Sequence, residues 1–341
     1  MINRSSLLLT PVLTIAEPLY SITTITKMKK NYILIFTFII LILSCKKEEI
    51  KPNFKPLFNK VFSIIKTESI KKEEINWTLI EKKIDDSIPV FRNNNDVYNG
   101  ILQTLSIIND KHSFFLYPKD KSNFLTNDSI KIPEIESEIL EGNIGYLKIL
   151  GFAGNDSLSS LYSSKIRKSL KQIDNQSNLS GWIIDLRNNK GGKIGMIPLG
   201  ISLLYQNSII GFSYKKNEKY LIHRLLNNKY FYDNEVVASS NNKDTLFNKN
   251  KKIAILVNEN TASQAEFTAQ SLKFQNGTKI FGTKTIGLTS DVMTYQFTSG
   301  AILGITNAEM CNKNKEIIYG ITPDIECKSE QSLELAIEWI K

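Results

Sequence analysis

Short apolar runs alternate with longer amphipathic stretches through most of this chain. Apolar, partly β-branched runs with the pattern of strands buried on both faces lie at 143–149, 181–187 and 253–257. Apolar residues recur at helical spacing over 156–173, and helix-like runs cover 194–205 and 262–273. Strands that alternate with helices in this way predict an α/β fold.

The flanking segments have different patterns. Two apolar stripes at helical spacing within 57–109 predict a small helical domain that ends near His112. Strands are expected within 208–250 and over 292–306 and 315–326, and a closing helix over 333–340. His223, inside the first of these segments, is interpreted as a structural or surface histidine.

Ser263 lies where the strand at 253–257 gives way to a helix. The first N–H groups of a helix have no intrahelical partner and can hold an oxyanion. Ser263 is therefore a candidate nucleophile, with Gln264 N–H as a candidate oxyanion donor. Ser263 and Glu266 also fit a capping box, as do Thr261 and Gln264, so a purely structural role stays open.

A pair of glycines follows the strand at 181–187. Gly191 and Gly192 would let backbone N–H groups approach a ligand closely. A tight turn would also explain them, as would a phosphate site at the start of the helix, since Gly195 follows at glycine-rich-loop spacing. The phosphate signal is weak because the full dinucleotide fingerprint and a Gly-Lys-Ser/Thr ending are both missing.

The ordered blocks NIGYLKILGF, IIDLRNNKGG, VNENTASQAE, IFGTKTIG and YGITPDIE together resemble the tail-specific, or C-terminal processing, serine protease family. The resemblance covers roughly residues 143–341. It implies a crotonase-like α/β spiral core, here 137–341, with Ser263 as nucleophile. It also implies an oxyanion hole made by Gln264 N and the Gly191–Gly192 pair, and protein or peptide substrates.

The chain departs from the family at the general base. Leu288 stands where archetypal members carry a lysine, and Lys284 is a poor substitute. The chain instead resembles the tricorn-core branch, in which a histidine from the preceding segment is the base, and this points to His112. Ser113, Asp110 and Glu266 are candidate supporting residues, and Asp110, Glu309 and Asp324 are candidates for orienting the imidazole.

The segment between His112 and the first strand of the core is short. Archetypal members carry a PDZ module there, but residues 113–141 are too few to hold one, so recognition of a free C-terminus is not expected. A catalytically inactive peptide-binding scaffold of the same fold is the alternative to an active peptidase. Acyl-CoA chemistry on the same core is disfavoured because the chain is expected to be exported.

Residues 28–45 have a basic start, an apolar stretch and a small residue before Cys45, the form of a secretory signal. Ile42 to Cys45 resembles a bacterial lipobox, which implies cleavage before Cys45 and lipidation of its thiol. An uncleaved anchor is the alternative, although the apolar stretch is short for a membrane span. Residues 1–27 are interpreted as a spurious extension and 46–56 as a tether. The helical domain with its connecting loop covers 57–136.

The composition of the chain argues against several classes of function. The formal net charge is +9 in 341 residues, and no dense basic run carries interleaved aromatic residues, so nucleic-acid binding is not expected. No histidine and cysteine cluster has metal-ligand spacing, and neither a metal nor a cofactor is expected. Cys311 and Cys327 flank a hairpin-like stretch, 317–325, and could pair in an oxidising envelope or remain free thiols. The chain is expected to be anchored by lipid to a bacterial membrane, in the periplasm or at the cell surface.

Overall fold

A computed structural model describes residues 53–117, 131–176, 178–216, 218–241, 244–297 and 300–341. Cys45, the predicted extension and signal peptide, and the predicted tether up to residue 52 lie outside these residues. Among the residues described, no helix combines the length and hydrophobicity that a bilayer crossing needs.

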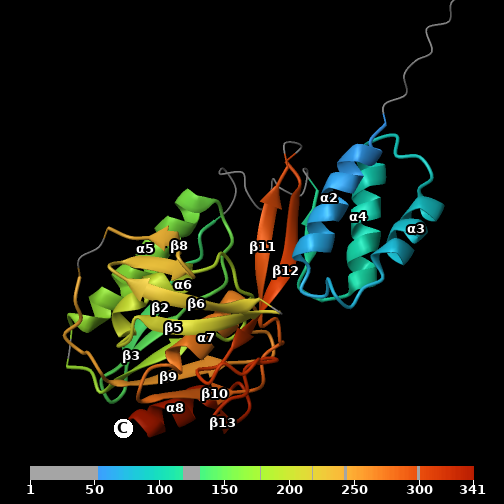
Figure 1. Cartoon of the computed structure of the whole chain (residues 1–341). Coiled ribbons are helices and arrows are strands. Elements are labelled where there is room, and N and C mark those ends of the chain that lie inside the picture. The colour runs from blue at the N-terminus through green and yellow to red at the C-terminus, as the bar shows by residue number, and fades with distance from the viewer. Residues whose placement is uncertain (1–52, 118–130, 177, 217, 242–243, 298–299) are drawn as a thin grey trace, which may run out of the picture. The chain divides into compact units, whose positions relative to one another are not determined.

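Three helices form the N-terminal part: α2 (Lys55–Glu68), α3 (Trp77–Ser87) and α4 (Asn94–Ile108). The side chains of Asn76 and Asn93 cap α3 and α4 by accepting from backbone N–H groups of the first turn. The apolar stripes of the three helices pack against Phe115 of β1 (Phe114–Leu116) and against Leu303 and Ile305 of β12 (Ile302–Cys311). Figure 1 shows α2 and α4 beside β12. The predicted helical segment is present, and it is anchored to a strand near the opposite end of the chain.

The central sheet has the order β13-β10-β9-β4-β3-β2. Its strands are β2 (Glu136–Leu140), β3 (Ile144–Lys148), β4 (Gly181–Asp185), β9 (Lys252–Val257), β10 (Thr278–Gly282) and β13 (Ile325–Glu326). All neighbouring pairs are parallel except β2 with β3. The three apolar runs of the sequence are therefore adjacent strands at the centre of this sheet.

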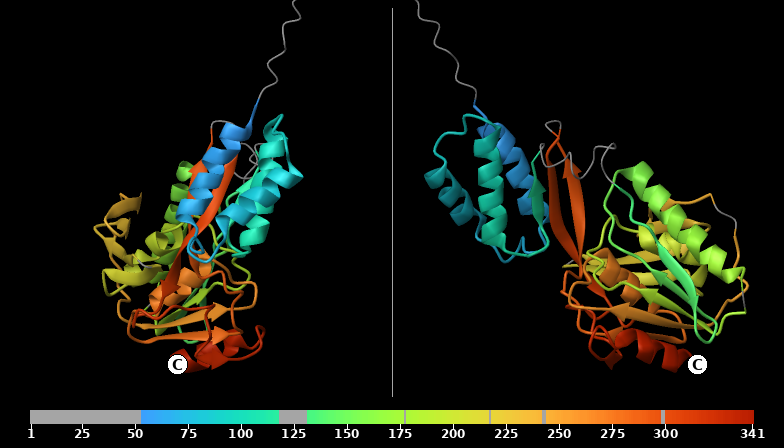
Figure 2. Two further views of the ribbon diagram at one scale, coloured as in Figure 1. Left: turned by 45° about the vertical axis from the view of Figure 1, so that its right-hand side comes forward. Right: turned by 180° about the vertical axis from the view of Figure 1, so that it is seen from behind.

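Both faces of the central sheet are buried, as the continuous apolar runs predict. In β9, Ile253, Ile255 and Val257 face one core, which contains α5 (Asp156–Asp174), α6 (Met196–Gly200) and α7 (Gln264–Leu272). Ala254 and Leu256 face the opposite core, which is closed by α8 (Ser332–Ile340). Figure 2 shows α5 and α8 on opposite sides of this sheet. The alternation of side chains along one strand thus builds two cores.

A second sheet has the order β1-β12-β5-β6-β7-β8, with β11 (Ser290–Gln296) paired to β12 beside this path. Its remaining strands are β5 (Ile209–Lys215), β6 (Lys219–Leu226), β7 (Lys229–Tyr232) and β8 (Glu235–Ser239). Met310 of β12 and Tyr230 of β7 share a core with Phe267 of α7. This contact joins the second sheet to the helix that follows Ser263.

Three predicted elements need correction. The single strand expected at 292–306 is two antiparallel strands, β11 and β12, and the strand expected at 315–326 is reduced to β13 and an isolated bridge at Ile317. The helix-like run at 194–205 is α6 followed by a 3-10 helix (Ser202–Leu204). Pro198 lies in the first turn of α6, where a proline is tolerated because the first N–H groups of a helix have no intrahelical partner.

Candidate active site

Ser263 lies at the junction of β9 and α7, as the sequence predicts. Its backbone has φ 54° and ψ −119°, outside the regions that an L-residue normally occupies. Such strained residues are found preferentially at functional sites, where the surroundings hold them in place. Ser263 is half-buried and lines a cleft of about 1340 Å³.

Glu266 supports this turn. The glutamate half of the capping box is formed, since Glu266 Oε2 accepts from Ser263 N at 2.8 Å. Its other oxygen accepts from Thr285 Oγ1 at 2.5 Å and Gly287 N at 2.9 Å. The side chain is fully buried, and this burial raises its pKa in spite of the donors around it. Glu266 therefore connects the Ser263 turn to the loop at 283–288 and does not line the cleft.

The Gly191–Gly192 loop lies directly against Ser263. A Cβ atom on Gly191 would be 2.8 Å from Ser263 Cβ and 3.1 Å from Gln264 N, and one on Gly192 would overlap Phe152 O. Gly191 N donates to Asn189 Oδ1 at 2.9 Å. Of the predicted oxyanion donors, this leaves Gly192 N and Gln264 N for a ligand.

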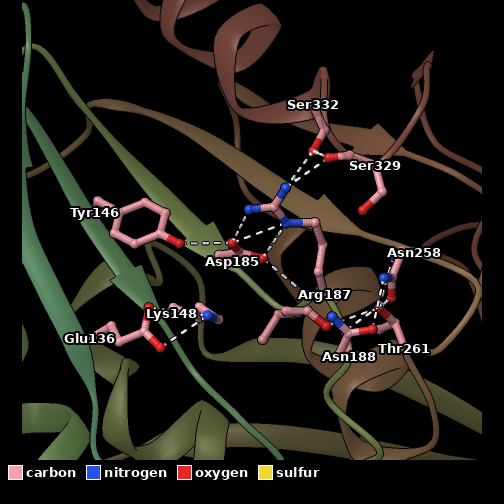
Figure 3. Close-up of polar contacts among 11 residues, drawn as sticks. Glu136, Tyr146, Lys148, Asp185, Arg187, Asn188, Asn258, Thr261, Ser329 and Ser332 are labelled. Atoms are coloured by element: carbon pink, nitrogen blue, oxygen red, sulfur yellow. Dashed lines mark hydrogen bonds and ion pairs between the residues drawn. The ribbon is translucent and has the colours of Figure 1, made fainter.

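Asparagine side chains hold the two loops together. Asn188 N donates to Asn258 Oδ1 at 2.9 Å, and Asn258 Nδ2 donates back to Asn188 Oδ1 at 3.0 Å (Figure 3). Thr261 Oγ1 donates to Leu186 O at 2.9 Å, and Ala262 N donates to Asn189 O at 2.9 Å. The loop after β4 and the loop after β9 are thereby fixed to each other beside Ser263.

A buried ion pair fixes the start of the glycine loop. Arg187 Nε donates to both oxygens of Asp185, at 2.9 and 3.0 Å, and Arg187 Nη1 donates to Ser329 O at 2.7 Å (Figure 3). Tyr146 OH donates to Asp185 Oδ2 at 2.8 Å, and burial raises the pKa of this phenol. The arrangement joins β3, β4 and the segment before α8 next to the loops that carry the site.

His112 lines the same cleft as Ser263. It follows α4 in a tight turn in which Asn109 and Lys111 have positive φ. Asp110 Oδ1 accepts from His112 N at 3.1 Å and from Ser113 N at 2.7 Å, and its Oδ2 accepts from Ser113 Oγ at 2.5 Å. Asp110 and Ser113 therefore fix the backbone of the turn and do not hydrogen-bond the imidazole.

The partner of the imidazole is Ser290, which no feature of the sequence singled out. His112 Nδ1 lies 2.8 Å from Ser290 Oγ, and Ser290 also lines the cleft. Burial lowers the pKa of His112, while the nearby charges of Asp110 and Asp291 oppose this effect. The imidazole is therefore neutral at neutral pH and can accept a proton.

The other residues considered as partners of the imidazole, Asp324 and Glu309, form hydrogen bonds or ion pairs with other groups. Asp324 accepts from Lys273 Nζ and Ile280 N, and Glu309 is close to Lys216 and hydrogen-bonded to Tyr319. Leu288, where the resemblance places a lysine, lines the cleft, whereas Lys284 is exposed and outside the lining.

The second histidine, His223, and the two cysteines Cys311 and Cys327 lie outside the cleft lining. His223 is fully buried between Ser213 Oγ and Tyr230 OH, at 2.8 and 2.6 Å, which confirms a structural histidine. Cys311 and Cys327 are free thiols. No group of three metal-ligating side chains occurs among the residues that could be described.

These groups together suit acyl transfer. The residues that carry a hydroxyl, a neutral imidazole and two backbone donors line one cleft, whose walls also include Phe152, Phe267 and Met310. A serine nucleophile needs a base, and its tetrahedral intermediate needs donors for the oxyanion. The cleft is large enough for several residues of a peptide.

Known sequences agree with this chemistry. Residues 143–327 match the model of peptidase family S41. The chain is 30% identical to a nisin-resistance protein of Lactococcus lactis subsp. lactis over 267 residues, which are 78% of this chain and 80% of that protein. It is 26% identical over 223 residues to a probable CtpA-like serine protease of Staphylococcus epidermidis, covering 64% of this chain but only 40% of that longer protein.

Solved structures show the same fold. A lipoprotein from Streptococcus agalactiae superposes with a TM-score of 0.72 at 21% identity, over 85% of this chain and 96% of that one. The photosystem II D1 C-terminal processing protease superposes with a TM-score of 0.58 at 13% identity, over 82% and 94% of the two chains. The α/β protease fold expected from the sequence is thus confirmed. The chain belongs to peptidase family S41 and is a serine peptidase.

Proposed function

We propose that this protein is an exported endopeptidase that cleaves proteins or peptides through an acyl-enzyme on Ser263, with His112 as the general base. One observation carries the proposal: Ser263 and His112 line a single cleft, and Ser290 occupies one nitrogen of the imidazole. The other nitrogen, Nε2, remains to accept a proton. Leu288 cannot take this role because its side chain has no basic group.

The proposed reaction follows from these positions. His112 Nε2 accepts the Ser263 hydroxyl proton as Ser263 Oγ attacks the scissile carbonyl carbon. Gly192 N and Gln264 N donate to the oxyanion that forms. The imidazolium then protonates the leaving amine, and His112 activates the water that releases the acyl group from Ser263.

Ser263→Ala is the first test. It should abolish turnover of a denatured protein substrate such as unfolded casein, with Ser160→Ala, an exposed change in α5, as the control. If Ser263 were only a helix cap, the variant would lose about 0.5 to 2 kcal/mol of stability and keep its activity. If the wild type cleaves no peptide under any condition, the inactive-scaffold alternative is favoured.

The name of one relative suggests a first specific substrate. Because the similarity to the nisin-resistance protein covers most of both chains, we include nisin itself as a candidate peptide. Incubation of nisin with wild type and Ser263→Ala, followed by mass spectrometry, tests this candidate. Intact nisin after incubation with a wild-type enzyme that cleaves casein would exclude it.

We also propose that the protein is a lipoprotein of the bacterial envelope, with Cys45 as its first mature residue. The support is the signal-like segment 28–45 and the structural similarity to a protein described as a lipoprotein. Mass spectrometry of the native N-terminus should find a diacylglyceryl group on Cys45. An intact 28–45 segment would contradict the proposal.

A further inference from the structure

The imidazole of His112 has a hydroxyl partner where serine peptidases commonly have a carboxylate. Ser290 Oγ lies 2.8 Å from His112 Nδ1, although the two residues are 178 positions apart in the chain. None of the three carboxylates that the sequence suggested forms a hydrogen bond with this ring in the described part of the chain. A carboxylate at this place would fix which ring nitrogen carries the proton, and a serine hydroxyl does the same when it accepts from the ring N–H.

The next residue supplies a negative charge. Asp291 is 7% exposed, lines the cleft and accepts from Tyr232 OH at 2.9 Å. A second neighbour is His223, whose Nε2 lies 3.8 Å from Asp291 Oδ2. Burial lowers the pKa of His223, so this neighbour is neutral and does not compensate the Asp291 charge.

Two acidic side chains act on His112. Asp110 lies on the histidine's own turn, and Asp291 lies on β11. Glu309, the register partner of Ser290 on β12, is close to Lys216. Asp291 thus follows Ser290 on β11 and lines the same cleft as His112.

We propose that Ser290 is the positioning residue that holds His112 as the Nδ1–H tautomer, and that Asp291 stabilises the imidazolium formed during catalysis. The inference rests on the proposed role of His112. Ser290 Oγ accepts from Nδ1–H, which leaves the Nε2 lone pair for the Ser263 proton. As Ser263 Oγ bonds to the carbonyl carbon, that proton moves to Nε2, and the ring becomes positive near Asp291. The proton then leaves with the amine.

Kinetics of Ser290 variants test the positioning role. Ser290→Ala should lower kcat at least about tenfold, with little change in KM. The loss should be smaller than the full effect of general base catalysis, because His112 itself remains in place. Ser290→Thr, which keeps the hydroxyl, should recover most of the loss. Met293→Ala, an exposed position on the same strand outside the cleft lining, is the control. Wild-type kcat in Ser290→Ala would overturn this role.

The pH profile tests Asp291. Removing a negative charge that raises the pKa of His112 should lower that pKa further. The acidic limb of kcat/KM should therefore move to lower pH in Asp291→Asn, and kcat should fall. A limb that does not move would overturn the role of Asp291.

One measurement does not depend on activity or on the folding of a variant. The ¹⁵N chemical shifts of His112 in the wild-type protein report its neutral tautomer, and the Nδ1–H form is expected. The Nε2–H form would overturn the inference. His112→Ala, assayed in parallel, separates the two proposals: if it stays active the proposed function fails, and if it is inactive while Ser290→Ala is normal only this inference fails.

Discussion

Gly192 lies where the backbone leaves no room for a side chain. Its φ of 150° is rare for L-residues, and a Cβ atom would overlap Phe152 O. Gly192→Ala should therefore displace the loop beside Ser263, lower kcat by orders of magnitude and cost about 1 to 3 kcal/mol of stability. Turnover and urea unfolding measure the two effects.

Gly277→Ala is the matched control for Gly192→Ala. Gly277 also has a positive φ, 72°, but the nearest atom to an added Cβ is 3.9 Å away. This variant should lose about 1 kcal/mol of stability through backbone strain and keep wild-type kcat. Equal kcat in both variants would argue against a role for the Gly192 loop in catalysis.

His112 should set the acidic limb of the pH profile. Burial lowers its pKa below the usual value, and only the neutral ring can accept the Ser263 proton. Activity should therefore rise with pH along a limb centred below about 6.5 and then reach a plateau. Initial rates across buffers of constant ionic strength measure this limb. A limb centred above about pH 8 would indicate a lysine base instead.

The sequence allows Ser263 and His112 to be predicted but not Ser290. Ser263 occupies a strand-to-helix junction inside a recognisable block, and His112 is one of only 2 histidines in the chain. A serine at the start of a partly exposed strand has no local signal, because its role depends on contact with a distant turn. Asp110 and Ser113 are predicted from proximity in the chain, but their hydrogen bonds go to the backbone, to each other and to Thr306 of β12, and none goes to the imidazole.

At the scale of elements, Glu266 couples α7 to the loop that follows β10. Glu266→Gln replaces one acceptor oxygen by an NH₂ group that faces backbone donors. A buried donor left without a partner costs about 1 to 3 kcal/mol, so unfolding free energy should fall by about that amount. Because the same bonds hold the Ser263 turn, kcat should fall as well.

Glu334→Gln is the control for this change, since Glu334 lies in the first turn of α8 and is exposed. It should change the unfolding free energy by less than about 0.5 kcal/mol. Chemical denaturation of the two variants under the same buffer compares them. Equal effects at both positions would contradict the coupling assigned to Glu266.

The sequence predicts strands correctly where every residue of the strand is buried, and less well where buried and exposed residues are mixed irregularly. The continuous apolar runs form β3, β4 and β9, because a strand covered on both faces needs apolar residues at every position. Residues 315–326 are also rich in apolar residues, yet little of this stretch forms a strand. There the chain turns at Lys315 and Gly320, both with positive φ, and hydrogen-bonds irregularly to Thr285 and Thr289.

At the scale of the whole described chain, the site depends on pieces that are distant in sequence. His112 precedes β1, which pairs with β12, while Ser263 follows a strand of the central sheet and Ser290 begins β11. The hydrophobic pattern predicts strands and helices one at a time, and it carries no information on the pairing of β1 with β12 that brings His112 to the cleft. The resemblance to known blocks points to Ser263 as the proposed nucleophile, whereas only the three-dimensional contacts reveal the surroundings of His112, the proposed base.

The most direct test of the central claim is covalent labelling of the nucleophile. The protein should react with a fluorophosphonate, and mass spectrometry of the digested adduct should place the phosphonyl group on Ser263. His112→Ala should fold normally and label at least about a hundredfold more slowly, because an unassisted serine hydroxyl is a weak nucleophile. Labelling of another residue, or equal labelling rates in wild type and His112→Ala, would contradict the account.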